Sequence, residues 1–394
     1  MPHASRIRPY FAACAILLSL APHARAWSEG GHHLIGLLAY HLLDADEKAA
    51  FQEMLAAHPR FADDFKPPGN VANPDRWRAG RAGYWPDVAR RQPTYNRPDW
   101  HWEDAVTLVV GNRDAVQLPN HVTRLPRGAD LDSKDLHASQ ATVLCQRVMG
   151  DATAPASDRA IALCWLGHLV ADVHQPCHAG SLYAASVFPR GDRGGNSIDT
   201  KQRGNLHALW DGLLGPRYNE TSENRRFAEI VGDADLMARG ERAAEKMDPL
   251  DWLEESRLAS VKTAYTNEVL APVRAVAEGR AESMPVVTVS PEYLETAGRM
   301  ATLRACQAGW RLASVWRSGL AAPIERTTAR VTPSESMTSS VTTMAPADAD
   351  AVGSYWLNTK TGVRHNASCR NFENTKGGRN CNEGEGKPCG ICGG

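Results

Sequence analysis

Two short segments of the sequence place a histidine and an aspartate one helical turn apart. His168 precedes Asp172 by four positions, and His207 precedes Asp211 by the same interval. Residues four apart on a helix project from one side, so each pair can hold a metal ion between an imidazole and a carboxylate. His178 follows the first pair closely, in HQPCHAG. A lone histidine is more often structural, but two such pairs favour a metal site, because these side chains are costly to bury unless they are ligated or paired.

Two more candidate ligands lie upstream, in a tryptophan-rich region. Asp87 stands in YWPDVAR and His101 in DWHWED. The aromatic residues beside them fit several roles: they can pack, stack on a base, or enclose a dry metal pocket. The residue types alone leave these roles open.

Helices must carry these residues, and the hydrophobic periodicity predicts them. The segment at 156–175 is expected to be a helix that Ser157 caps and Pro176 stops, and a long helix is expected to begin at Ser290 and Pro291. The best strand candidate is TLVVG. We therefore predict an all-α domain with long irregular loops at 60–130 and 178–203. Further helices are expected at 30–43, 45–57, 132–149, 204–214, 222–246 and 250–277.

Residues 1–26 have the order of regions found in a secretory signal. Arginines precede an apolar run at 11–21, and the small-residue sequence Ala-Arg-Ala ends at Ala26. We expect cleavage after Ala26 and a secreted or periplasmic protein. A buried N-terminal helix that stays attached is the alternative. No later apolar run approaches the ~18–20 residues that span a bilayer, so no membrane partner is expected.

The overall charge gives no sign of a nucleic-acid partner. The chain has 44 basic and 45 acidic side chains, and removing 1–26 takes away three arginines and no acid. Proteins that hold phosphate through Lys and Arg are usually basic. A phosphate substrate of this protein is therefore expected to be held by something else, such as metal ions.

Composition also divides the chain. Residues 27–322 are rich in predicted helix, 323–353 form a Ser, Thr, Ala and Pro-rich linker, and 354–394 form a Cys-rich tail. In the tail, the cysteines with His365 are spaced like a small zinc knuckle, while two disulfides or an unstructured tail are the alternatives. The tail cysteines are Cys369, Cys381, Cys389 and Cys392.

The helical region has four cysteines of its own. In an exported protein we expect one or two disulfides among them, with no pairing readable from the sequence. Cys177, next to His178, can instead be buried apolar filler. The four are Cys145, Cys164, Cys177 and Cys306.

Taken in order, the motifs resemble those of the zinc-dependent single-strand nucleases of fungi and the bifunctional nucleases of plants. The resemblance covers residues 27–322, about three quarters of the chain. Any one motif alone is a weak signal, but the whole set in this order is specific. The motifs are W-x4-H (Trp27, His32), W-x-D (Asp87), W-H (His101), H-x3-D-x5-H (His168, Asp172, His178), G-G-N (Gly194 to Asn196) and N-L-H-x3-D (His207, Asp211).

The resemblance implies a helical fold of the zinc phospholipase C and nuclease type, with three zinc ions. Asp87, His101, His168 and Asp172 would hold one ion, and His178, His207 and Asp211 a second. The third would bind Trp27, His32 and the other oxygen of Asp172. Trp27 would contribute its carbonyl and its α-amino group, whose ordinary pKa of about 7.7–8.0 lets it release its proton to a metal near neutral pH.

The resemblance also implies a reaction. A hydroxide activated by the ions, with Asp87 and Asp172 as the catalytic carboxylates, would hydrolyse phosphodiesters of single-stranded DNA or RNA to 5′-phosphates. A 3′-nucleotidase activity stays open. Trp102 and Asp104 match a base pocket, although packing in the wall is the other interpretation. The G-G-N run is expected to let backbone pass close to the site, and His33 and His174 are expected to be structural.

Two other functions compete with this interpretation. A zinc phospholipase C has a similar N-terminal tryptophan and fold, but its last ligand is typically a glutamate, where this chain has Asp211. A zinc-binding protein without catalysis is the second. For the nuclease we expect a monomer whose partner is single-stranded nucleic acid, with no stable protein partner, and a further zinc ion if the tail is a knuckle.

Overall fold

The computed structural model describes residues 27–322, 355–366, 369, 371–372, 377–381 and 385–389. They fall into two separate units, which we call the helical unit (27–322) and the sheet module (355–389). The predicted signal at 1–26, the predicted linker at 323–353 and Cys392 lie outside the described residues. No described helix is long and apolar enough to cross a membrane.

The helical unit confirms the prediction of a mainly α-helical domain. Its short strands are β1 (Val106–Val110), β2 (Ser181–Ala184), β3 (Asp199–Thr200) and β4 (Gly204–Asn205), and its short helices of other types are η1 (Pro98–His101), η2 (Arg113–Ala115), η3 (Pro176–His178) and η4 (Ser260–Ala264). Its α-helices are α1 (Glu29–His41), α2 (Ala45–Ala56), α3 (Phe61–Asp64), α4 (Pro74–Ala89), α5 (Ala138–Gly150), α6 (Ala156–Asp172), α7 (Leu206–Asp211), α8 (Glu220–Gly232), α9 (Ala234–Ala243), α10 (Pro249–Ala259), α11 (Asn267–Ala277) and α12 (Pro291–Leu320).

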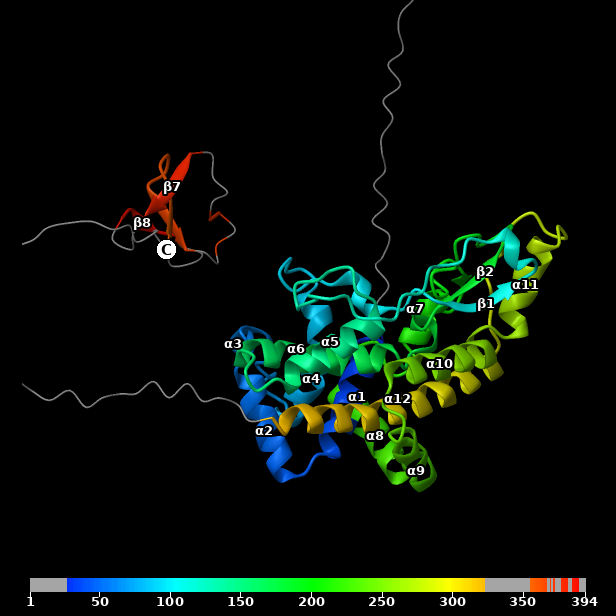
Figure 1. Cartoon of the computed structure of the whole chain (residues 1–394), viewed down its shortest axis with the longest axis horizontal. Helices are drawn as coiled ribbons and strands as arrows, with labels where there is room; N and C mark the ends of the chain where they lie inside the picture. The colour runs from blue at the N-terminus through cyan, green and yellow to red at the C-terminus, as the bar shows by residue number, and fades with distance from the viewer. Residues whose placement is uncertain are drawn as a thin grey trace, which may run out of the picture. The chain divides into compact units, whose positions relative to one another are not determined.

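Helix α6 is the centre of this unit. It packs against α1, α2, α4, α5 and α12, and nearly every residue of its last three turns is buried. A helix surrounded on all sides has no solvent face, which explains why its sequence is apolar all round. In Figure 1, α6 lies among these helices, while the parallel pair β1 and β2 lies away from them, beside α11. The polar residues at the end of α6 are therefore held in a closely packed interior.

Helix α4 lies where the sequence predicted irregular loop, so that prediction was wrong. Asn73 caps it by accepting from the Arg76 amide at 3.0 Å, and Pro74 occupies its first turn. Its glycines and internal proline hide the helical pattern, because these residues disfavour helix in isolation. Packing overrides that preference: a Cβ on Gly167 of α6 would lie 2.9 Å from the Gly83 Cα of α4. These glycines let the two helices cross closely.

Two predicted helices are each divided. The segment 222–246 forms α8 and α9, because the Asp233 carboxylate accepts from the Leu236 amide at 3.0 Å and caps a new helix. The segment 250–277 is interrupted by the π-helical turn η4 before α11 begins. Ser157 does not cap α6, which starts at Ala156, whereas Ser290 caps α12 as predicted, accepting from the Tyr293 amide at 3.0 Å.

The four cysteines of the helical unit form no disulfide in the structure, contrary to expectation. Each is buried in the apolar core, where a thiol packs as a small hydrophobic side chain. Burial raises the pKa of each thiol, that of Cys306 to about 12. The filler role suggested for Cys177 agrees with this burial.

Glu223 is a buried acid of α8, a helix that packs against α1. Its side chain is 5% exposed, and neither oxygen has a hydrogen-bond partner among the described residues. It lines a cavity of about 70 Å³ with Tyr218 and Arg76. Burial raises the pKa of Glu223 to about 9, although Arg76 nearby acts in the opposite direction. The folded protein therefore holds this proton at neutral pH.

Glu223→Gln should stabilise the protein at alkaline pH. The unfolded chain releases the Glu223 proton near the ordinary pKa of 4.5, and the folded chain releases it near 9. Stability is therefore lost as pH rises between these values, and the amide removes that loss. We expect a gain of several kcal/mol at pH 9 and little change at pH 5, measured by urea unfolding. Glu229→Gln, at an exposed position of α8, is the control; equal pH profiles for all three proteins would contradict the prediction.

Candidate metal centre

The crossing of α4 and α6 brings the first ligands together. The backbone oxygen of Gly83 on α4 accepts from Nδ1 of His168 on α6 at 2.8 Å. This bond turns Nε2 of His168 toward Asp172, 3.3 Å away, and toward Asp87, 4.0 Å away. Asp87 belongs to the last turn of α4, which the sequence had left as loop. The missed helix is therefore the element that positions a predicted ligand.

His101 completes this group from η1. Its Nδ1 lies 2.8 Å from Nε2 of His168 and 3.2 Å from Oδ2 of Asp172. All three side chains are buried. Two imidazole nitrogens and a carboxylate oxygen thus converge on one point, which is the donor arrangement of a small metal site.

Asp172 also faces His32, on the first turn of α1. Nε2 of His32 lies 3.4 Å from Oδ1 of Asp172, and its ring stacks on His168 with centroids 4.0 Å apart. Oδ2 of Asp172 faces His101 and His168 instead. The two oxygens of one carboxylate thus point at different histidines, the arrangement a bridging carboxylate requires.

Trp27 is held beside these residues by two hydrogen bonds of its segment. Its buried indole Nε1 donates to the backbone oxygen of Ala171 at 3.0 Å. The amide of the next residue, Ser28, donates to the backbone oxygen of Asp211 at 2.9 Å. The segment is therefore tied both to the residue before Asp172 and to Asp211.

The second group consists of His178 from η3 with His207 and Asp211 from α7. Nε2 of His178 and Nε2 of His207 lie 3.8 and 3.6 Å from the two oxygens of Asp211. Nδ1 of His178 donates to the His101 oxygen, and Nδ1 of His207 donates to the Gly194 oxygen at 2.8 Å. Backbone acceptors that fix the tautomer in this way are typical of metal-binding histidines. The group therefore has oriented Nε2 atoms around one carboxylate.

Burial shifts the pKa values in both groups so that the uncharged form of each side chain is favoured. Desolvation lowers the pKa of His32, of His101 and of His168, the last to about 4. Desolvation also raises the pKa of Asp211 to about 7 and that of Asp172 well above its ordinary value. The imidazoles are therefore neutral and free to act as ligands, while these two carboxylates lack the positive charge that would keep them ionised. A bound cation would supply that charge.

The donor set fits zinc ions. Three buried atoms have no hydrogen-bond partner among the described residues: the two ring nitrogens of His32 and Oδ1 of Asp172. Such atoms are costly to bury unless something binds them. The donors are nitrogen and oxygen without a thiolate, a mixture that suits zinc in catalytic sites. In the helical unit, three groups have ligand atoms within 4.8 Å of one another: His32, Asp87 and His168; His101, His168 and Asp172; and His178, His207 and Asp211.

Trp102 and Asp104 line a cavity that reaches these ligands. The cavity has a volume of about 340 Å³, and His178 and His207 are in its wall. Trp102 is partly exposed and packs edge-on against His137. An aromatic face and a carboxylate beside oriented histidines are suited to a base next to a phosphate.

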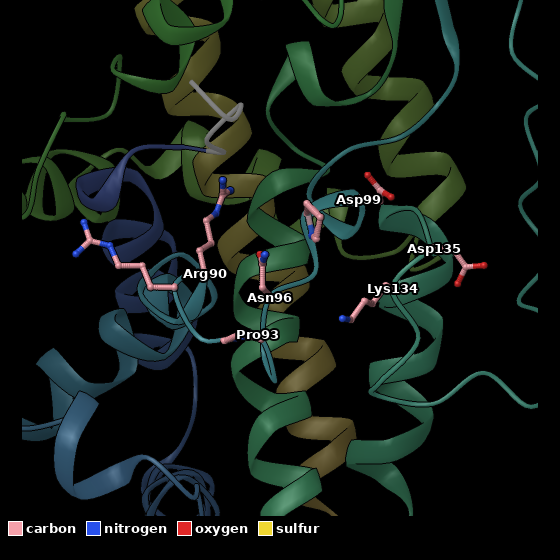
Figure 2. A pocket seen from close by; sticks show the side chains of 8 residues that line it. Arg90, Pro93, Asn96, Asp99, Lys134 and Asp135 are labelled. Carbon is pink, nitrogen blue, oxygen red and sulfur yellow. The ribbon is translucent and has the colours of Figure 1, made fainter. Parts of the chain in front are cut away.

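Two further cavities adjoin this one, and all three have basic residues in their walls. One of about 540 Å³ shares His207 and Asn196 with it, and the other of about 350 Å³ shares Arg90. Figure 2 shows the second of these, with Arg90 and Asn96 on one side and Lys134 and Asp135 on the other. The same walls hold seven acidic residues beside seven basic ones, so they form no net basic surface and agree with the overall charge near zero. The basic residues are Arg90, Arg91, Lys134, Arg190, Arg193, Arg203 and Arg217.

Asp192 supports the second group, and the sequence interpretation missed it. Its fully buried carboxylate accepts from the Leu182 amide at 2.9 Å and from the Tyr265 hydroxyl at 2.7 Å. It also accepts from the amides of Gly194 and Gly195, and burial raises its pKa to about 6. An aspartate beside the glycine pair, in GDRGGN, was the available signal.

The glycine pair itself behaves as predicted. A Cβ on Gly194 would lie 2.1 Å from the Cys177 oxygen, so the backbone passes close to the site only because the residue is glycine. Arg193 before it has φ +59°, a strained conformation for a residue with a side chain. The Asp192 bonds hold this strained turn, which presents the Gly194 oxygen to His207.

Two residues that the sequence excluded from the site are indeed outside the three groups. His174 donates from Nδ1 to the Val170 oxygen at 2.6 Å, and its Nε2 lies 2.8 Å from Arg311. His33 packs against Gly80 and the Tyr218 ring.

The sequence interpretation also missed Arg90, which forms a 2.6 Å ion pair with Asp87. Its position about one helical turn after Asp87 was the only sign of this contact in the sequence.

Comparison with known proteins agrees with this geometry. The chain is 24% identical to Endonuclease 4 of Arabidopsis thaliana over 224 residues, which cover 53% of the chain but 62% of that protein, less than two thirds of its length. It is 24% identical to Endonuclease 5 of the same plant over 239 residues, covering 57% of the chain and 68% of that protein. The model of the S1/P1 nuclease family matches residues 27–320, which include every ligand described above. Because that match takes in well over half of the sequence, the chain belongs to the S1/P1 nuclease family.

Proposed function

We propose that this protein is an exported, zinc-dependent endonuclease that hydrolyses phosphodiester bonds of single-stranded DNA or RNA to 5′-phosphate products. The observation that carries the proposal is the convergence of the three ligand groups, with Asp172 contacting two of them. Membership of the S1/P1 nuclease family and the names of the relatives support a nuclease. A 3′-nucleotidase activity would use the same site on a shorter substrate.

Three zinc ions would be held by nine residues. Zinc ions there would lower the pKa of a nearby water and neutralise phosphate charge. The chain positions them: Gly83, His101 and Gly194 orient histidines through backbone oxygens, and Asp192 holds the Gly194 turn. The proposed ligands are Trp27, His32, Asp87, His101, His168, Asp172, His178, His207 and Asp211.

Export would complete the site. Cleavage after Ala26 would give Trp27 a free α-amino group beside Asp172 and Asp211, where the bonds of its indole and of Ser28 hold the segment. The freed amine and the carbonyl of Trp27 would together help to hold one ion. Activity therefore depends on correct processing, and we propose that the working form is the secreted or periplasmic monomer.

An extension ahead of Trp27 should abolish hydrolysis of single-stranded DNA. A protease-cleavable extension removes the free amine, and we expect activity to fall by more than the roughly 10- to 100-fold typical of lost outer-shell partners. Cleavage that regenerates Trp27 should restore both activity and a third zinc ion per chain, measured by elemental analysis. Chelator should abolish activity of the processed form, and phosphatidylcholine should not be hydrolysed. Full activity of the extended form would contradict the role of Trp27.

The proposed preference for single strands over duplex is supported by the wall of the 340 Å³ cavity. Stacking on Trp102 and a hydrogen bond to Asp104 need a base that is unpaired and turned out of its strand. A duplex hides both the base face and the base edge.

Trp102→Leu and Asp104→Asn should each lower kcat/KM on single-stranded DNA. A stacked base contributes roughly 1–3 kcal/mol, so we expect a loss of about 5- to 150-fold for Trp102→Leu. Zinc content should not change, because neither side chain is a ligand. Asp114→Asn, at an exposed acid of η2, is the control. If both variants cleave single strands as well as the parent protein does, the two residues are only wall packing.

The cavity of Figure 2 extends the site away from the ligands and suits a polymer. Arg91 and Lys134 are exposed in its wall, although Asp99 and Asp135 also line it. A dinucleotide bound at the ligands would not need these cations, whereas a longer strand would place a phosphate near them. They are therefore expected to affect long substrates selectively.

The double variant Arg91→Ala, Lys134→Ala should weaken cleavage of long single strands and leave dinucleotide cleavage unchanged. Each lost phosphate contact should reduce the slope of log affinity against log salt by about 0.7. Lys262→Ala, an exposed lysine on η4, controls for the loss of charge. An equal effect on both substrate lengths would exclude an extended strand path through this cavity.

A further inference from the structure

The described residues of the sheet module form almost no apolar core. Its described strands are β5 (Tyr355–Asn358), β6 (Val363–Asn366), β7 (Gly378–Cys381) and β8 (Lys387–Pro388), in the order β7-β5-β6-β8. Its large apolar side chains are only partly buried. A unit of this size rarely folds on hydrophobic burial alone, and usually needs disulfides or a metal. Its buried described residues are Arg364, His365, Cys369, Cys381 and Cys389.

Three of those side chains meet. One ligand atom from each of His365, Cys369 and Cys389 lies within 4.8 Å of the others. Sγ of Cys369 is 3.3 Å from Nδ1 of His365. Zinc bonds of about 2.3 Å to sulfur and about 2.0 Å to nitrogen place tetrahedral ligands about 3.5 Å apart, so the separation suits a shared ion.

The backbone creates this meeting point. Strand β8 pairs in parallel with β6, with Arg364 opposite Pro388, so the next residues along the two strands are His365 and Cys389. The Cys389 amide donates to the Arg364 oxygen at 3.0 Å, continuing the pairing. The Cys369 amide donates to the Asn366 oxygen at 3.0 Å, which closes a turn that returns Cys369 to His365.

We propose that the sheet module binds one zinc ion through His365, Cys369 and Cys389, separately from the catalytic ions. Thiolates select zinc over magnesium and calcium, and both thiols release their protons on binding. Cys392, one of the tail cysteines, lies outside the described residues. The ion ties the two-residue strand β8 to β6, so its binding energy contributes to folding of the module.

The buried histidine distinguishes zinc from disulfides. Two disulfides among the tail cysteines would use Cys381, which lies on β7 and is not part of the ligand group. With two disulfides, His365 would be buried beside sulfur atoms and would bind no metal ion. A zinc ion uses His365 and leaves Cys381 as a small buried side chain.

The test is metal content of full-length protein with single cysteine changes. Cys369→Ser and Cys389→Ser should each lose one zinc ion per chain, and Cys381→Ser, the matched control in the same sheet, should lose none. Nuclease activity should be equal in all four proteins. In the cobalt-loaded protein, thiolate-to-metal absorption bands should appear and should be absent from Cys369→Ser, because the catalytic ligands include no thiolate.

Three results would overturn the proposal. The first is unchanged zinc content in Cys369→Ser and Cys389→Ser. The second is an equal loss of zinc in Cys381→Ser, which would contradict the ligand assignment. The third is protection of Cys369 and Cys389 from alkylation in denatured, chelator-treated protein until a reductant is added, which would identify disulfides instead.

Discussion

The helical unit depends on one electrostatic constraint: it buries five imidazoles and three carboxylates against one another. Other protein groups do not supply enough charge to keep these side chains ionised, because burial favours neutral histidines and protonated acids. Asp87 forms an ion pair with Arg90, but Asp172 has histidines as its closest partners. Cations would convert the same arrangement from costly to favourable, since each imidazole would gain a partner and each carboxylate a charge. The rest of the fold can be understood as the frame that holds this cluster in place.

That frame uses backbone more than side chains. Glycines at 83 and 167 let α4 and α6 cross closely, and the oxygen of Gly83 orients His168. The oxygens of His101 and Gly194 do the same for His178 and His207. Because carbonyl oxygens cannot be lost by side-chain substitution, the ligand orientations depend on helix crossings and turn conformation. Asp192 is the side chain that fixes such a turn.

Much of this could be predicted from the sequence, because the ligands occur in short motifs with a fixed spacing. His168 with Asp172 and His207 with Asp211 lie on helices as expected. Helix α4 was missed, because glycine and proline conceal helices that packing stabilises. The prediction of disulfides in the helical unit was wrong. The spacing of cysteines along the sequence does not show whether a thiol is buried in the apolar core. The cavity walls hold as many acidic as basic residues, in agreement with the overall charge near zero.

The most direct test of the account is a crystal structure of the protein beginning at Trp27, with anomalous diffraction measured on both sides of the zinc absorption edge. The account predicts three peaks in the helical unit: one among Asp87, His101, His168 and Asp172, one among His178, His207 and Asp211, and one beside Trp27 and His32. Absence of zinc peaks at these ligands in fully active protein would contradict it.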